Sequence, residues 1–345
     1  MKILFISYTF HPAVGGIESS AQLLLREFKQ RNCQIVVVTH TPLRENHELS
    51  GFDIHRRPTL STQLQLARWA DIIYHHNPAF SFWIPFLSKR PIVFSIHTWV
   101  TRTDGRISWK DRLKQKVLSR YPCIANSRAT AAHLPGPSTV IENAYDDEIF
   151  TNQTPWNQRN GAAFVGRLVS DKGVPTVLEA IAKAKQQGLS MPFKIIGSGP
   201  DQEELQEQSD RLGIGDEVVF LGRLDPEQIN AELNQVKYLL VPSKWAEPFG
   251  IVALEGIASG CIPIGTNQGG LVDAIGKCGP LFDKDQSDQL AKLLIDLETH
   301  PNLVEEFRKH HPDHLNTHSP RGVADQYLKV FRTAIATKKK LRGRK

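Results

Sequence analysis

Short apolar runs that alternate with helical segments constrain the fold of this chain more than any other feature. In the first part of the sequence the runs cover residues 2–7, 34–39, 71–76, 91–97, 122–126 and 138–143. Near-continuous apolar strands separated by helices are typical of a parallel sheet that is covered on both faces. Between the first two runs Ile17, Leu24, Leu25 and Phe28 follow a helical period, which predicts a helix over residues 16–31 packed on that sheet.

The alternation stops at a polar stretch and then starts again. "TNQTPWNQRN", residues 151–160, contains Pro and has no periodicity, so we interpret it as an interdomain linker. Further apolar runs follow at 161–166, 192–197, 217–222, 237–243 and 261–266, with helical segments near 173–188, 201–212, 250–259 and 286–297. The sequence therefore predicts an α/β protein with two successive doubly wound parallel-sheet domains, over residues 1–150 and 161–319.

Composition supports a globular two-domain protein with a basic end. A chain of 345 residues is long for one core. Its formal charge is +6, and residues 338–345 form a basic tail. We interpret the tail as a solvated end, with an anionic membrane surface or nucleic acid as alternative partners. No apolar run approaches the roughly 18 residues of a spanning helix. "MKILFIS" is typical of a first strand, and the four cysteines lack C-x-x-C spacing, which favours buried, reduced thiols in a cytoplasmic protein.

Residues directly after the strands carry the chemistry, because open parallel sheets bind ligands outside the carboxyl ends of their strands. Gly15 and Gly16 precede the first predicted helix, where backbone N–H groups could face an anion, although a tight turn explains them equally well. "GRLVSDKG" places Arg167 and Lys172 on one connection after a strand. Two such cations suit a diphosphate leaving group, and the alternative is a solvated pair.

Two glutamates in "SKWAEPFGIVALEG", residues 243–256, are the next candidates. We expect Pro248 in the first turn of a helix, and Gly250 would let backbone approach a ligand. Glu247 and Glu255 could then point at one ligand, one meeting a vicinal diol and the other a sugar. Alternatively, Glu247 is only a favourable charge at a helix N-terminus.

A glycine turn in the second domain resembles a dinucleotide fingerprint without completing it. "GSGP" spans residues 197–200, but Gln202 stands where the third Gly of G-x-G-x-x-G belongs. An NAD enzyme is therefore a weak alternative.

Taken together, these motifs resemble a known family. "GRLVSDKG", "GSGP", "EPFGIVALE" and "NQGG", in this order, look like the second domain of retaining glycosyltransferases of family four, and "GGIE", "SIHTW", "ANS" and "IENAYD" match its first domain. The resemblance covers nearly the whole chain. It implies the GT-B fold, in which two Rossmann-like domains face each other across a cleft, and a helix over about 320–337 that returns to the first domain. Apolar residues in that segment have helical spacing.

The resemblance also implies a role for each site residue. Arg167 and Lys172 would neutralise the diphosphate, Glu255 would bind the ribose, and Glu247 would lie close to the transferred sugar. His97 would lie close to the donor sugar. The other residues that would bind the nucleotide sugar are Gly15 and Gly16 in the diphosphate loop, Gly197, Gly199, and Phe249, Gly250 and Ile251 through their backbone N–H groups. A satisfied polar residue is the alternative for His97.

The implied activity is transfer of a hexosyl unit from a UDP- or GDP-sugar to a glycan or lipid-linked acceptor, with retention and without metal or other cofactor. Such transfer would serve cell-surface polysaccharide or glycolipid synthesis in the cytoplasm or at the inner membrane face. Ala144, Thr98 and Asp273 depart from the usual pattern, and the first two leave the acceptor open. A nucleotide-sugar epimerase and a non-catalytic nucleotide-sugar-binding protein are the alternatives.

Three further segments allow two readings each. "HHPDHLNTH", residues 310–318, has metal-like His spacing, but Pro312 argues against a helix and no other ligands complete a site, so we expect a polar connection. Residues 80–90 are interpreted as a buried helix, and residues 109–120 as a solvated helix face. Both could instead touch an anionic membrane, whereas no nucleic-acid partner is expected.

Overall fold

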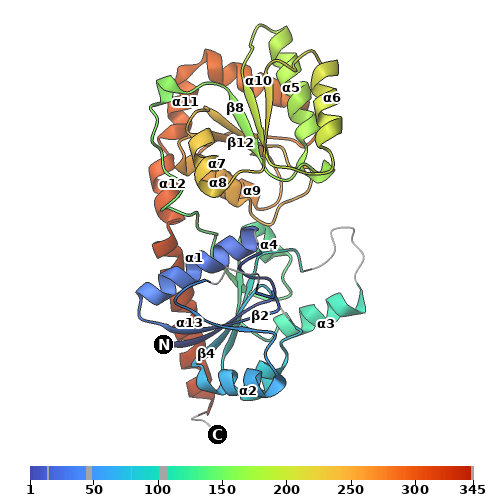
Figure 1. The fold of residues 1–345 in the computed structure, drawn as a ribbon. Coiled ribbons are helices and arrows are strands. Elements are labelled where there is room, and N and C mark those ends of the chain that lie inside the picture. The colour runs from blue at the N-terminus through green and yellow to red at the C-terminus, as the bar shows by residue number, and fades with distance from the viewer. Residues whose placement is uncertain (14, 44–48, 79, 101–107, 343–345) are drawn as a thin grey trace. The chain divides into compact units, whose positions relative to one another are not determined.

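The computed structural model describes residues 1–13, 15–43, 49–78, 80–100 and 108–342. The chain divides into two compact units, Met1–Ala144 with Pro320–Lys345, and Tyr145–Ser319. Figure 1 shows that each unit is built on one sheet flanked by helices. The predicted return of residues 320–337 to the first domain agrees with this division. The predicted boundary does not, because residues 151–160 belong to the second unit and form no separate linker.

The first unit contains a seven-stranded sheet in the order β3-β2-β1-β4-β5-β6-β7, and its neighbouring strands are parallel. The strands are β1 (Lys2–Ser7), β2 (Gln34–Thr39), β3 (Asp53–Arg56), β4 (Ile72–His76), β5 (Ile92–Ile96), β6 (Cys123–Ala125) and β7 (Ser138–Val140). Six of them lie within the predicted runs. Sequence reasoning missed β3, an edge strand with no fully buried residue and therefore no continuous apolar run.

Helices of the first unit pack on this sheet. They are α1 (Gly16–Gln30), α2 (Leu60–Trp69), α3 (Trp109–Leu118), α4 (Arg128–Ala132) and α13 (Pro320–Arg342), with the 3₁₀ helix η1 (Ile84–Ser88). Phe28 of α1 and Phe331 of α13 meet at a ring-centroid distance of 5.7 Å in the core. The predicted buried helix over residues 80–90 is wrong, since η1 is a short 3₁₀ segment and Trp83 before it is 53% exposed.

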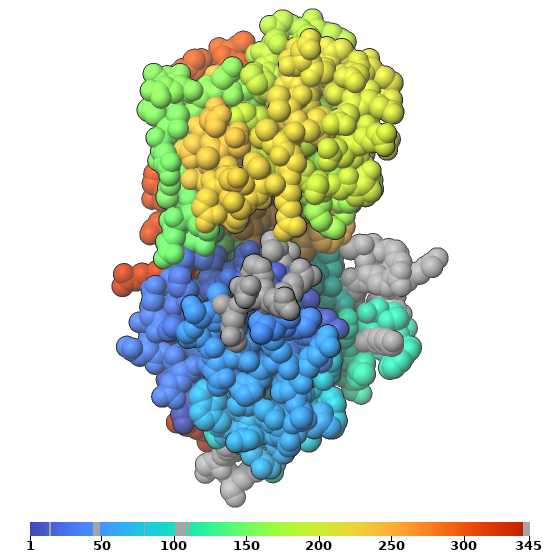
Figure 2. Space-filling model, in the orientation of Figure 1, coloured from blue at the N-terminus to red at the C-terminus, as the bar shows by residue number. Residues whose placement is uncertain are grey.

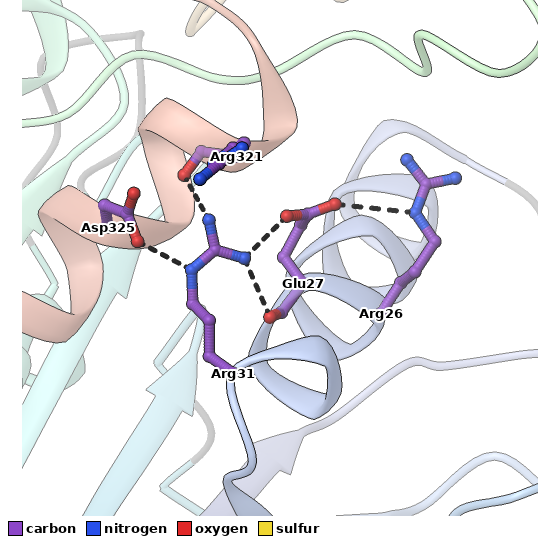
Figure 3. Close-up of polar contacts among 5 residues, drawn as sticks. All are labelled: Arg26, Glu27, Arg31, Arg321 and Asp325. Carbon is purple, nitrogen blue, oxygen red and sulfur yellow. Dashed lines mark hydrogen bonds and ion pairs between the residues drawn. The ribbon is translucent and has the colours of Figure 1, made fainter.

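A single arginine joins α13 to α1 (Figure 3). Arg31, just after α1, donates from Nε to Asp325 Oδ1 at 2.6 Å and from Nη2 to the carbonyl oxygen of Arg321 at 2.9 Å. Its Nη1 reaches Glu27 Oε2 at 2.7 Å. Because the guanidinium fork holds both helices at once, it fixes the last helix to the first unit independently of the apolar core.

The second unit contains a six-stranded sheet in the order β10-β9-β8-β11-β12-β13, and its neighbouring strands are also parallel. The strands are β8 (Ala162–Val165), β9 (Phe193–Ile196), β10 (Val218–Gly222), β11 (Tyr238–Val241), β12 (Ile262–Thr266) and β13 (Leu281–Phe282). Only β13 was missed, because two residues show no periodicity. The helices are η2 (Trp156–Gln158), η3 (Ser170–Lys172), α5 (Val174–Gln186), α6 (Gln202–Arg211), α7 (Pro226–Leu233), α8 (Ile251–Ala258), α9 (Leu271–Ile275), α10 (Ser287–Thr299), α11 (Pro301–Arg308) and α12 (His311–Thr317).

The polar stretch at residues 151–160 is anchored to the second unit by Arg159. This side chain is buried, and its guanidinium donates to six oxygen acceptors, including the carbonyls of Thr154, Leu233 and Ser259. Because buried polar groups require hydrogen-bond partners, these contacts hold the polar segment against the second unit. The polar composition of this segment indicated a linker. In the folded protein, however, its polar groups find hydrogen-bond partners within the second unit.

Two further expectations need correction. Residues 311–317 are helical, because Pro312 occupies the first turn of α12, where its missing N–H has no intrahelical partner to lose. His314 and His318 bond carbonyl oxygens, of Ala274 at 2.8 Å and of His314 at 2.7 Å. The cysteines were expected to be buried, reduced thiols. All four are free thiols, but Cys33 is only half-buried.

Candidate active site

The candidate site of the second unit lies at the carboxyl ends of β8 and β11. These strands are neighbours although two others separate them in sequence, and the strand order reverses between them. A doubly wound sheet opens a crevice at such a reversal, since the two connections leave to opposite sides. The loops after β8 and β11 carry Arg167, Lys172 and Glu247, so the topology brings together residues from two distant motifs.

The loop after β8 holds its two cations differently. Arg167 is exposed, and its side chain has no hydrogen bond or ion pair within the described part of the chain. Lys172 ends η3 and is partly buried. Gly173 follows with φ +73°, and a Cβ there would lie 2.0 Å from the carbonyl oxygen of Pro242. Only glycine fits this approach, which presses the Lys172 turn against the end of β11.

Lys172 and Glu247 form an ion pair across the two strand ends. The distance from Lys172 Nζ to Glu247 Oε1 is 2.8 Å, and the two side chains are 20% and 11% exposed. Ser243 also donates its hydroxyl to Glu247 Oε1. The other carboxylate oxygen, Oε2, lies 3.7 Å from the position that a Cβ on Gly250 would occupy. One oxygen of Glu247 is therefore fixed, and the other faces the glycine turn. Sequence reasoning missed Ser243, although the quoted stretch begins with it.

The loop after β12 supports this turn from behind. Gly270 donates its N–H to the carbonyl oxygen of Glu247 at 2.8 Å. A Cβ on Gly269 would lie 2.5 Å from that same oxygen, and one on Gly270 would lie 2.1 Å from the carbonyl oxygen of Pro248. The glycines of "NQGG" are therefore packing residues that hold the glutamate turn in place.

The helix that follows starts later than predicted. Gly250, with φ +102°, is the N-cap, and α8 begins at Ile251, so Pro248 precedes the helix instead of lying in its first turn. The Phe249 side chain is buried in the apolar core. The N–H groups of Phe249, Gly250 and Ile251 have no hydrogen-bond partner among the residues that the structure describes. Unpaired donors at a helix start attract anions.

Glu255 lies one turn into α8. Its side chain is partly exposed, and it makes no hydrogen bond to any described residue. Desolvation, and after it the nearby Asp146 carboxylate, together raise the pKa of its carboxyl to about 7. Desolvation of a carboxylate that no hydrogen bond compensates lowers the stability of the folded protein. Such groups are typical of functional sites.

Gly197 and Gly199 have a structural role. Gly197 has φ +138°, and a Cβ there would lie 1.8 Å from the carbonyl oxygen of Gly166. A Cβ on Gly199 would lie 2.0 Å from the carbonyl oxygen of Leu168. Both glycines let the loop after β9 pack directly on the backbone that carries Arg167, so they position that cation.

The first unit holds the remaining predicted residues. Gly15 is the N-cap of α1 in an extended conformation, and Gly16 is its exposed first residue. His97 follows β5, is buried, and joins its Nε2 to Ser95 Oγ at 2.6 Å. Burial, followed by the neighbouring His76, lowers the pKa of His97 well below its usual value, so the ring is neutral. Its Nδ1 is buried without a hydrogen bond to a described residue.

His76 connects this region to α1 and was missed in the sequence. Its Nε2 bonds the carbonyl oxygen of Ile17 at 3.0 Å, and its Nδ1 bonds Tyr74 Oη at 2.9 Å. Its ring lies 4.2 Å from that of His97. His76 thus holds the start of α1, and with it the Gly15–Gly16 turn, against the end of β4. A His at a strand end was the only signal.

Comparisons with known proteins identify the family and the fold of the chain. Residues 14–149 match the family described as Glycosyltransferase Family 4, and residues 146–313 match Glycosyl transferases group 1. An uncharacterized glycosyltransferase of Methanocaldococcus jannaschii is 34% identical, over 80% of this chain and 83% of that protein. A GDP-mannose:cellobiosyl-diphosphopolyprenol alpha-mannosyltransferase of Xanthomonas oryzae is 24% identical, over 76% and 78% of the two chains.

The solved structure of Anabaena HepE in complex with UDP has a similar fold. It superposes with a TM-score of 0.80 at 20% identity, over 96% of this chain and 100% of that one. This chain also superposes on a sucrose-phosphate synthase of Thermosynechococcus elongatus with a TM-score of 0.76 at 18% identity, over 97% of this chain and 99% of that one. The fold is therefore that of the GT-B enzymes, and the chain belongs to the group 1, family four glycosyltransferases.

Proposed function

We propose that the protein transfers a hexosyl unit from a UDP- or GDP-sugar to a glycan or lipid-linked acceptor, retaining the anomeric configuration. The Lys172–Glu247 pair at the strand reversal carries this proposal, because it joins the loop that bears Arg167 to the turn that precedes α8 and Glu255. Relatives support the donor class, since one is a GDP-mannose-dependent transferase and one solved structure contains UDP.

The diphosphate would bind where positive charge and free N–H groups gather. Lys172 uses one of its three N–H donors on Glu247, which leaves two for phosphate oxygens. Arg167 adds a bidentate fork, and the start of α8 adds the N–H groups of Gly250 and Ile251. Charge that develops on the departing phosphate is stabilised by these groups, so we propose that no metal is needed.

Carboxylates would orient the rest of the donor. Glu255 accepts hydrogen bonds from the ribose hydroxyls, because an ionised carboxylate offers two acceptor oxygens for a vicinal diol. Glu247 already has Oε1 occupied by Lys172 and Ser243, so Oε2 receives a hydroxyl of the sugar. A role for His97 beside the donor sugar stays a prediction from the family resemblance, and its ring is neutral with an Nδ1 that has no hydrogen bond to a described residue.

The bond changes need no protein nucleophile. The acceptor oxygen bonds the anomeric carbon on the face from which the diphosphate leaves, and its proton passes to the departing phosphate oxygen. Positioning and charge stabilisation by the protein supply the acceleration.

The test combines donor binding with product analysis. Thermal shift and calorimetry against UDP, GDP, ADP and their sugars identify the donor, and chromatography of the products follows transfer. Lys172→Ala should abolish transfer and weaken diphosphate binding. Lys237→Ala is the matched control. Lys237 also forms an ion pair, with Glu298 at 2.9 Å, and its side chain is 22% exposed, as against 20% for Lys172. Wild-type transfer by Lys172→Ala would refute the assignment, and an isomerised nucleotide sugar without acceptor would identify an epimerase.

Membrane contact forms part of the same proposal. No helix among the described residues is long and apolar enough to span a membrane. Helix α3 lies at the surface of the first unit (Figure 2), where Trp109 is 71% and Leu113 is 55% exposed beside Lys114 and Lys116. This face would lie on an anionic bilayer at the inner side of the membrane. Trp109→Gln with Leu113→Gln should release the protein from phosphatidylglycerol vesicles, and unchanged co-sedimentation would exclude α3.

A further inference from the structure

A cavity lies in the first unit, at the amino ends of β5 and β6 and thus at the opposite end of the sheet from His97. Its volume is about 600 Å³. One wall comes from the chain at the amino ends of β5 and β6 and from Thr139 and Ile141 in and after β7, and the other comes from α13. The amino ends of parallel strands are not where the family's donor site lies, so this cavity needs its own explanation.

Four cations line the cavity. Arg90 and Arg120 stand next to the strand entries, and Lys329 and Lys338 come from α13. No carboxylate lines it in the described portion of the protein, and none of the four cations forms an ion pair there. The Arg90 guanidinium is half-buried and donates to the carbonyl oxygen of Arg68, and it forms no ion pair with a described carboxylate. Like charges that share one concavity repel each other unless an anion joins them.

The wall formed by α13 has a regular design. Gln326, Val330, Ala334 and Lys338 recur every four residues, and Lys329, Thr333 and Thr337 form the adjacent row. Residues four apart lie on one helix face, so both rows face the strands. The middle of this face carries small side chains, which leave the space open, and the cations stand at its ends. The strand wall adds Pro91, Ile92 and Tyr121, so apolar surface lies beside the charges.

We propose that this cavity binds a phosphate group, carried either by the headgroup of an anionic lipid or by a soluble phosphate ester. Arg90, Arg120, Lys329 and Lys338 would hold the phosphate oxygens, because guanidinium and ammonium donors complement them. Thr333 and Thr337 lie within the same wall and offer hydroxyl donors. The apolar lining suits the glycerol or acyl portion of the ligand. This site is independent of the donor site and of helix α3.

Binding of sn-glycerol 3-phosphate, measured by calorimetry on the full chain, tests the site. Lys329→Gln with Lys338→Gln should weaken binding at least tenfold, because two of four charges are lost. Lys284→Gln with Lys292→Gln is the charge-matched control on the exposed surface of the second unit. It should bind like the wild type, and so should Lys172→Ala, which affects the donor site alone. Thermal unfolding confirms that each variant folds.

A cavity-filling variant distinguishes binding of the phosphate ligand inside the cavity from nonspecific electrostatic attraction to the basic surface. Thr337→Trp leaves the charge unchanged and fills the space along α13, so it should also lose binding at least tenfold. Vesicles of phosphatidylglycerol and of phosphatidylcholine then identify the source. Binding to the former with the same dependence on Lys329 and Lys338 assigns a lipid headgroup, whereas binding of glycerol phosphate alone assigns a soluble ester. The proposal is overturned if Thr337→Trp binds normally, or if the control pair weakens binding as much as the lysine pair in α13.

Discussion

Replacing Glu255 with Gln should stabilise the second unit at neutral to alkaline pH while weakening nucleotide binding. Desolvation and the Asp146 carboxylate raise the pKa of Glu255 from an ordinary 4.5 to about 7. Below the lower pKa, folded and unfolded states are both protonated and Glu255 costs nothing. Between the two values the unfolded chain releases its proton while the folded chain keeps it. Stability therefore falls as pH rises, until the loss is complete above the folded pKa.

The size of the effect follows from the two pKa values. A factor of ten in proton affinity is about 1.4 kcal/mol, so the loss from pH 4.5 to 8 approaches about 3 kcal/mol. Glutamine carries no charge and avoids this cost. Chemical denaturation should show the variant about 2 to 3 kcal/mol more stable than the wild type at pH 8, with the gap closing near pH 4.5.

The binding measurement gives the opposite sign. An ionised Glu255 accepts two hydroxyl hydrogens of a ribose, and glutamine accepts fewer, so donor affinity should fall roughly tenfold. Affinity in the wild type should also decline as pH drops below about 7. Glu204→Gln, on α6, removes the same charge from an exposed position and serves as control. Equal stability of Glu255→Gln and the wild type at pH 8, or a gap that persists at pH 4.5, would refute the reasoning.

Three stability predictions accompany this one. Arg159→Met should destabilise the second unit by about 3 to 4 kcal/mol in denaturant titrations, since it leaves buried acceptors unpaired, and a loss below about 1 kcal/mol would contradict the anchoring role. Gly173→Ala should cost at least about 2 kcal/mol, against about 1 kcal/mol for Gly188→Ala, where φ is also positive but no atom lies within 4 Å. Arg31→Ala should cost the first unit about 2 kcal/mol, and a double-mutant cycle with Asp325→Ala should show coupling, whereas strict additivity would exclude the bridge between α1 and α13.

Lys172 and Glu247 mark the limit of what could be predicted about the site. Their residue types and positions after two strands were readable, because strand ends follow directly from the apolar runs. Their 2.8 Å contact spans 75 residues of sequence and depends on β8 lying beside β11. Periodicity does not encode which strands become neighbours. The same limit applies to Ser243 and to the glycines of "NQGG", whose roles depend on atoms from other loops.

The sequence by itself determined most of the alternation of buried strands and helices, because burial on both faces of a parallel sheet demands continuous apolar runs. It also determined which residue types follow those strands. Only the tertiary structure decided that a polar stretch around Arg159 is anchored, that α8 starts after Pro248, and that four cations of the first unit share one cavity. Each of these depends on partners that are distant in the chain, and the free energy of such contacts exists only once the sheet has formed.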